Sequence, residues 1–97
     1  MAQEGRLPMQ GKAKPADTAG EDRQDERAVL VHVIDTHPTT LRLSDLIREL
    51  GGTEDFAKRD GIERAVRELV KGGLLFRCEG AVLPTRAALY AYELLDA

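Results

Sequence analysis

The chain has one cysteine, no tryptophan and only four aromatic residues in 97. Cys78 therefore has no partner for a disulfide within the chain. His32 and His37 are the only other sulfur or nitrogen side chains that commonly bind metals. A structural metal site needs about four Cys or His ligands at short spacing, so no metal site is expected. The longest apolar run is far too short to cross a bilayer, and no stretch resembles a secretory signal. A cytoplasmic protein without a membrane contact is expected.

Catalytic patterns are also missing. No nucleophile, base and orienting group can be assembled from the sequence, and neither glycine pair, Gly51-Gly52 or Gly72-Gly73, lies in a phosphate-loop pattern. The adjacent carboxylates Glu54 and Asp55 fall in a predicted exposed loop, where nothing raises a pKa. We therefore expect neither an enzyme nor a bound cofactor.

Charge is unevenly distributed along the chain, although the net charge is only −3. Residues 58–86 hold seven basic and four acidic side chains, a local charge of +3, whereas residues 26–57 hold three basic and six acidic ones. Local sign decides where a phosphate backbone can approach, so any nucleic-acid contact is expected within residues 58–86.

The first 25 residues are polar, rich in Gly and Pro, and poor in large apolar side chains. Such a segment buries too little surface to offset its ordering entropy, which predicts a disordered tail over 1–25 and one folded domain over 26–97.

The secondary structure of residues 26–37 is ambiguous. Val29, Leu30, Val33 and Ile34 fit a helix stripe, which we favour, yet the β-branched content also suits a buried strand.

Two further helices precede a hairpin. Ser44 is a suitable N-cap for a short helix ending at Gly51, and the extended residues 40–43 before it offer a third strand for the hairpin. Asp60 and Glu63 form a capping-box pattern, predicting a helix over 60–71 that glycines end. Ten residues, 51–60, would then separate these helices. Leu74–Cys78 and Ala81–Leu83 alternate as paired strands around a Glu79-Gly80 turn.

The C-terminal segment predicts a helix capped by Thr85. It is apolar nearly all round, which indicates that more than one side is covered, by the first helix and by a second subunit. A homodimer is therefore expected. The residues assigned to its interface are Leu89, Tyr90, Tyr92, Leu94 and Leu95.

This order of elements resembles the winged helix-turn-helix fold of small transcriptional regulators. The resemblance rests on residues 43–46 with Leu50-Gly51, on 62–75, on 77–80 and on 83–85, and it covers about 70 residues, 26–97. It implies a mainly α fold with a small β-wing, in the order helix, strand, helix, helix, hairpin, helix. The subfamily is not indicated by any motif.

The resemblance implies that the helix before the wing enters the DNA major groove while the wing touches the backbone. Arg64, Arg67 and Lys71 would lie on the exposed face of that helix, and Arg77 on the wing; Arg and Lys suit guanine and phosphate contacts. Together with the local charge, this predicts double-stranded DNA as the partner. The assigned DNA-binding residues are Lys58, Arg59, Arg64, Arg67, Lys71 and Arg77.

Two other interpretations remain open. The same basic side chains suit the solvated side of an amphipathic helix, with Glu63-Arg67 and Arg64-Glu68 as i, i+4 pairs. The overall acidity and the acidic loop at Glu54-Asp55 favour a winged-helix protein-interaction module that does not bind DNA.

Cys78 is expected to be a small buried residue on the face of Leu74 and Phe76.

Overall fold

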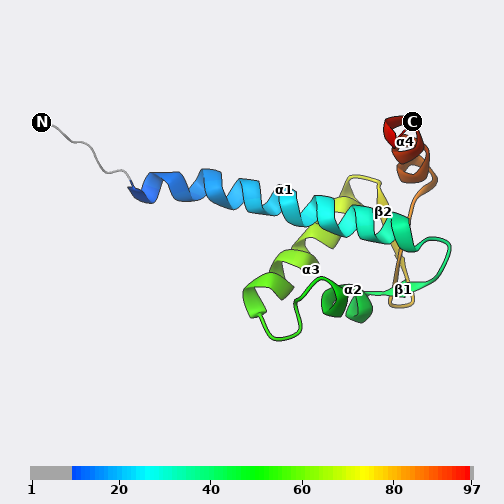
Figure 1. Ribbon diagram of the computed structural model, residues 1–97, viewed down its shortest axis with the longest axis horizontal. Coiled ribbons are helices and arrows are strands. Elements are labelled where there is room, and N and C mark those ends of the chain that lie inside the picture. Colours follow the sequence, from blue (N-terminus) through cyan, green and yellow to red (C-terminus); the bar gives the residue numbers. More distant parts are fainter. Residues whose placement is uncertain (1–9, 97) are drawn as a thin grey trace, which may run out of the picture.

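The computed structural model describes the backbone of residues 10–96 and the side chains of residues 20–96. It is mainly helical with one small antiparallel sheet, and Figure 1 shows the long first helix lying across the third. The elements are α1 (Gln10–Thr36), β1 (Leu41–Arg42), α2 (Leu43–Glu49), α3 (Phe56–Lys71), β2 (Leu75–Cys78), β3 (Ala81–Pro84) and α4 (Arg86–Asp96). The predicted order of elements is confirmed. Within residues 10–96, no helix combines the length and apolarity that a bilayer crossing needs.

Helix α1 differs from the prediction at its start. The ambiguous segment 26–37 is helical, as favoured, and the helix begins at Gln10, within the stretch 1–25 that was expected to be a tail. Two acidic side chains from this stretch pair with α3: Asp22 with Arg64 and Asp25 with Lys58. A prediction from composition underestimates the order of such a segment. Composition reflects how much apolar surface can be buried, and not which ion pairs form between helices. The remaining predicted tail residues, 1–9, lie outside the described part.

The N-termini of α2 and α3 both lie earlier than predicted. The N-cap of α2 is Arg42 instead of Ser44, and the Arg42 amide donates to Asp45 Oδ2 at 3.4 Å. The N-cap of α3 is Asp55 instead of Asp60, because the Asp55 carboxylate accepts from the Lys58 amide at 3.1 Å. Only residues 50–55 therefore join α2 to α3, six in place of the ten expected.

The sheet has the strand order β1-β3-β2. The hairpin turn is the predicted Glu79-Gly80, and both residues have positive φ, 51° and 85°, as a two-residue turn between antiparallel strands requires. Leu41 pairs with Val82, so the expected third strand is confirmed. Thr85 caps α4 as predicted, since its Oγ1 accepts from the Ala88 amide at 3.1 Å.

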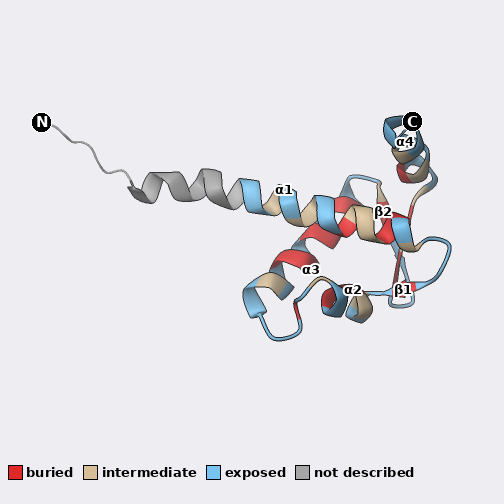
Figure 2. Cartoon of the chain, viewed as in Figure 1, coloured by how far each residue is buried: buried red, intermediate tan, exposed pale blue. Residues whose placement is uncertain are grey.

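The core is aliphatic and lies where α1, α2, α3 and one face of the sheet meet (Figure 2). Leu75 and Val82 bring the sheet into it, each 1% exposed. Leu75 points inward, so its neighbour Phe76 and, two residues further, Cys78 point outward. The expected burial of Cys78 is therefore wrong: the side chain is exposed. The fully buried side chains are Val29, Val33, Leu46, Ile62, Val66, Leu75 and Val82.

Candidate nucleic-acid interface

The open face of α3 carries three residues assigned to DNA that form no ion pair with another helix among the described side chains. Arg59, Arg67 and Lys71 are exposed there, and Arg67 and Lys71 are one helical turn apart. Arg59 Nε lies 3.6 Å from Glu63 Oε2, and Lys71 Nζ lies 3.3 Å from Glu68 Oε2. Ion pairs this exposed contribute little to stability, so Arg59 and Lys71 remain free to exchange partners. Arg67 makes no ion pair within residues 20–96.

Lys58 and Arg64, also on α3, form ion pairs with acidic side chains of α1. Lys58 Nζ is 3.4 Å from Asp25 Oδ1, and Arg64 Nη1 is 2.8 Å from Asp22 Oδ1. Buried Gly61 lies between the two pairs in the chain and faces Asp25 at the helix crossing. Arg64 is exposed on the same side of α3 as Arg67 and Lys71, but its charge is already paired with Asp22.

The hairpin adds a cation that sequence reasoning missed. Arg77 is exposed on β2, as expected for a wing residue. Arg42, from β1, lies against the turn: a Cβ on Gly80 would come within 2.9 Å of Arg42 Nη2. Only the pairing of Arg42 with Ala81 brings it there. The sequence did indicate a third strand over 40–43. It did not indicate the register of that strand, so the position of Arg42 beside the turn was not predictable.

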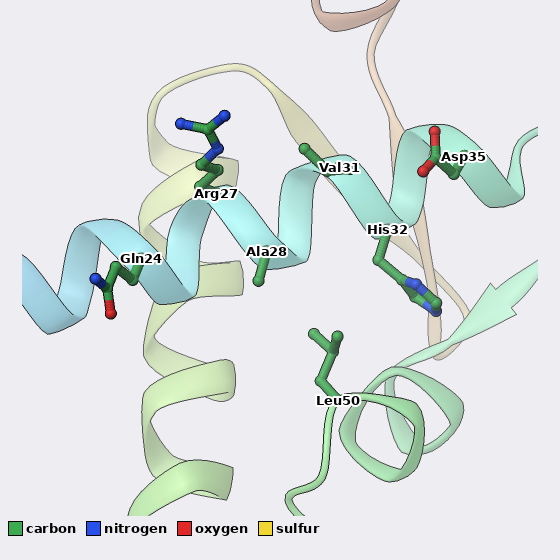
Figure 3. A pocket seen from close by; sticks show the side chains of 7 residues that line it. All are labelled: Gln24, Arg27, Ala28, Val31, His32, Asp35 and Leu50. Carbon is green, nitrogen blue, oxygen red and sulfur yellow. The ribbon is translucent and has the colours of Figure 1, made fainter.

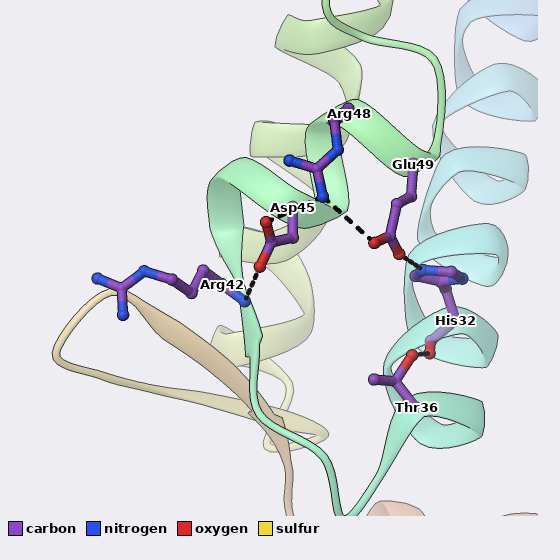
Figure 4. A network of polar contacts seen from close by, with 6 residues as sticks. All are labelled: His32, Thr36, Arg42, Asp45, Arg48 and Glu49. Carbon is purple, nitrogen blue, oxygen red and sulfur yellow. Dashed lines mark hydrogen bonds and ion pairs between the residues drawn. The ribbon is translucent and has the colours of Figure 1, made fainter.

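A polar network holds α2 against α1 (Figure 4). His32 Nε2 lies 2.5 Å from Glu49 Oε1, which joins the two helices. Arg48 Nη2 contacts Asp45 Oδ1 at 3.1 Å and Glu49 Oε2 at 3.6 Å. This network positions α2, and through the short connection it positions the N-terminus of α3. His32 thus joins two helices through Glu49. Within residues 20–96 no three acidic, His or Cys side chains gather as metal ligands.

Acidic and apolar groups share the surface with these cations. Asp60 and Glu68 are exposed on α3, and Glu79 lies at the hairpin turn. Phe56 is the first residue of α3, directly after the N-cap Asp55, and it is 81% exposed. The surface is therefore mixed, because exposed acids and Phe56 lie among Arg59, Arg67, Lys71 and the arginines at the hairpin.

A cavity of about 380 Å³ runs along α1 (Figure 3). Leu50 is the one lining residue that does not belong to α1. Polar groups that all project from one helix cannot surround a ligand from several sides, so this groove lacks the convergent contacts of a small-molecule site. The lining residues are Gln24, Arg27, Ala28, Val31, His32, Asp35 and Leu50.

Helix α4 separates the five residues assigned to a dimer interface into two groups. Leu89 and Tyr92 are half-buried on its inner side, and the Tyr92 hydroxyl donates to Asp35 Oδ1 of α1 at 3.5 Å. The negative charge of Asp35 is the main cause that raises the Tyr92 pKa above 10.0. Tyr90, Leu94 and Leu95 are 63%, 62% and 87% exposed.

Comparison with known proteins adds no relative: no protein-family model, curated protein or solved structure matches the chain.

Proposed function

We propose that this chain is a winged helix-turn-helix protein that binds double-stranded DNA, with α3 in the major groove and the β2-β3 hairpin beside the backbone. The order of elements and the strand order β1-β3-β2 support this fold. A helix of 16 residues with one exposed side, preceded by a short helix and a six-residue connection, suits entry into a groove that admits an α-helix.

The pair Arg67 and Lys71 carries the proposal. Both side chains are exposed on adjacent turns of α3, and Arg67 has no carboxylate partner within residues 20–96. Arg67 is placed to reach base edges, while Lys71 is placed to contact a phosphate. Arg77 and Arg42 would meet the neighbouring backbone. Lys58 and Arg64 act differently in this proposal: their pairs with Asp25 and Asp22 set the angle at which α1 crosses α3.

The test is fluorescence anisotropy of a mixed-sequence DNA duplex at 50 and 200 mM salt. If about four phosphates are neutralised, wild-type affinity falls on the order of a hundredfold between these concentrations. Arg67→Ala/Lys71→Ala removes two of the four cations that face the DNA, so its affinity is lower and falls only about tenfold between the two salt concentrations. Arg23→Ala/Arg27→Ala is the matched control, because it removes the same charge from exposed positions on α1.

Binding and salt dependence of the control should equal those of the wild type. Equal losses in both double variants would mean that net charge, and not the α3 face, drives binding. No binding at 50 mM salt by a folded wild-type protein would contradict the proposal.

A protein-interaction module is the second candidate, and exposed Phe56 favours it. An aromatic ring 81% exposed beside Glu54 and Asp55 is poorly placed against phosphates and well placed for an apolar pocket on a basic partner. In that case the folded wild type does not bind the duplex at 50 mM salt, and Phe56→Ala does not change this result. A DNA affinity that falls severalfold in Phe56→Ala would instead place the ring in the DNA contact and remove the observation that favours this candidate.

A further inference from the structure

The outer side of α4 carries an apolar stripe that nothing in the described chain covers. Ala87, Tyr90, Ala91 and Leu94 recur at helical spacing and are all exposed. The inner side, with buried Ala88, already packs on the rest of the domain. Figure 2 shows α4 projecting at the end of the molecule with its outer turns exposed. The stripe is therefore a second face, separate from the one that folds the domain.

Charges flank this stripe in a self-complementary arrangement. Arg86 and Glu93 are seven residues apart, so they lie on the same flank of the helix, one near each end. Both are exposed, and neither makes an ion pair among the described side chains. The opposite flank carries uncharged Leu95.

We propose that the outer face of α4 binds α4 of a second copy, antiparallel and about a two-fold axis that passes close to Tyr90. In such an isologous contact the same flanks meet, so Arg86 faces the partner's Glu93, and Glu93 faces the partner's Arg86. Ala87 then lies opposite the partner's Leu94, which pairs a small side chain with a large one. A parallel pair would set the charged flank against Leu95 and leave both charges without partners.

The opposite signs at Arg86 and Glu93 select a second copy over other occupants. A basic or acidic peptide would satisfy one of the two charges and repel the other. The helix of 11 residues is about 16 Å long, so the contact is short and the dimer forms at micromolar or higher concentration. This dimer would not block the proposed DNA surface, since its contacts lie on α4 alone, and it does not depend on DNA binding.

Sedimentation equilibrium of the full chain and of charge-reversed variants tests this pairing. The wild type should show a concentration-dependent monomer-dimer equilibrium. Arg86→Glu and Glu93→Arg each turn two attractions into two repulsions, so each should raise the dimer Kd by about tenfold or more. The double variant Arg86→Glu/Glu93→Arg restores opposite charges and should return the Kd to near the wild-type value.

Folding is not a confounding factor in the swap. Glutamate at the first residue of a helix and arginine in its last turn both suit the helix dipole, so far-ultraviolet circular dichroism should be unchanged. Leu94→Asp, which places a charge in the stripe, should be monomeric. A wild type that stays monomeric at about 1 mM, roughly a thousandfold above micromolar, would overturn the proposal. So would single reversals without effect, or a double variant as weak as the singles.

Discussion

Gly61 leaves room for an acidic side chain of α1 where the two longest helices of the domain cross. It is buried in the middle of α3, and a side chain there would overlap the Asp25 carboxylate of α1. Glycine usually weakens a helix interior, by about 0.5–1 kcal/mol relative to alanine. Its presence is explained by the crossing, because Asp25 needs this space to reach Lys58. One residue thus links helix propensity to the placement of α1.

A double-mutant cycle at this crossing checks that explanation. In an Asp25→Ala background, Gly61→Ala should stabilise the protein by about 0.5–1 kcal/mol, the gain expected from helix propensity. In the wild-type background the new methyl group displaces the Asp25 carboxylate, so the gain should be cancelled or reversed. Urea denaturation of the four proteins measures both values. The same gain in both backgrounds would show that Asp25 does not occupy this space in solution.

Tyr92 provides a pH-dependent contact between α4 and α1. The negative charge of Asp35, followed by smaller contributions that include Asp96, raises the Tyr92 pKa above its ordinary value of 10.0. A phenol whose pKa is higher in the folded state favours folding fully below the unfolded pKa, and this contribution is lost as pH rises through the folded pKa.

Phenolate absorbance of the Tyr90→Phe variant, which leaves Tyr92 as the one tyrosine, measures this pKa directly. The midpoint should lie above 10.0, and adding Asp35→Asn should lower it because the main raising charge is gone. A midpoint that does not respond to Asp35→Asn would mean that the Tyr92 hydroxyl does not lie beside Asp35.

At the scale of elements, Thr85 connects three of them. Its Oγ1 accepts from the Ala88 amide at 3.1 Å and donates to the Gly73 carbonyl at 2.8 Å. The same residue therefore starts α4 and ties it to the junction between α3 and β2. A helix cap that also satisfies a carbonyl of a distant loop fixes the direction in which the helix leaves the sheet.

Thr85→Ala should cost about 1–2 kcal/mol of unfolding free energy, since it removes a helix cap and a hydrogen bond together. Thr85→Ser keeps the hydroxyl and should cost much less. Chemical denaturation of both variants against wild type gives the comparison. Equal losses for alanine and serine would assign the effect to the methyl group and contradict the capping role.

Elements were predictable from the sequence where one local signal acted alone. Thr85, the Glu79-Gly80 turn and left-handed Gly73 each lie at the start or end of an element as predicted, because their local preferences have no nearby competitor. The start of α3 was not predictable in this way. Asp60 and Glu63 repeat the spacing of a capping box, but the Asp55 carboxylate reaches the Lys58 amide first, and one more helical turn is added before Asp60.

For the molecule as a whole, the sum of charges along the chain was an incomplete guide to the surface. The local excess of +3 over residues 58–86 counts Lys58 and Arg64, yet α1 supplies Asp25 and Asp22 to both. Those acids come from a segment predicted to be disordered, so sequence reasoning had no reason to subtract them. Arg42 was missed for the converse reason, since strand pairing alone brings it to the hairpin turn.

The central claim is that α3 and the hairpin form the DNA-facing surface, and an amide chemical-shift titration of the ¹⁵N-labelled protein with a short duplex at low salt tests it most directly. A chain of 97 residues suits this measurement. The account predicts shifts that concentrate at Arg67, Lys71, Arg77 and Gly80, with α4 unaffected. Shifts confined to α1 or α4, or none at duplex concentrations well above micromolar, would contradict it.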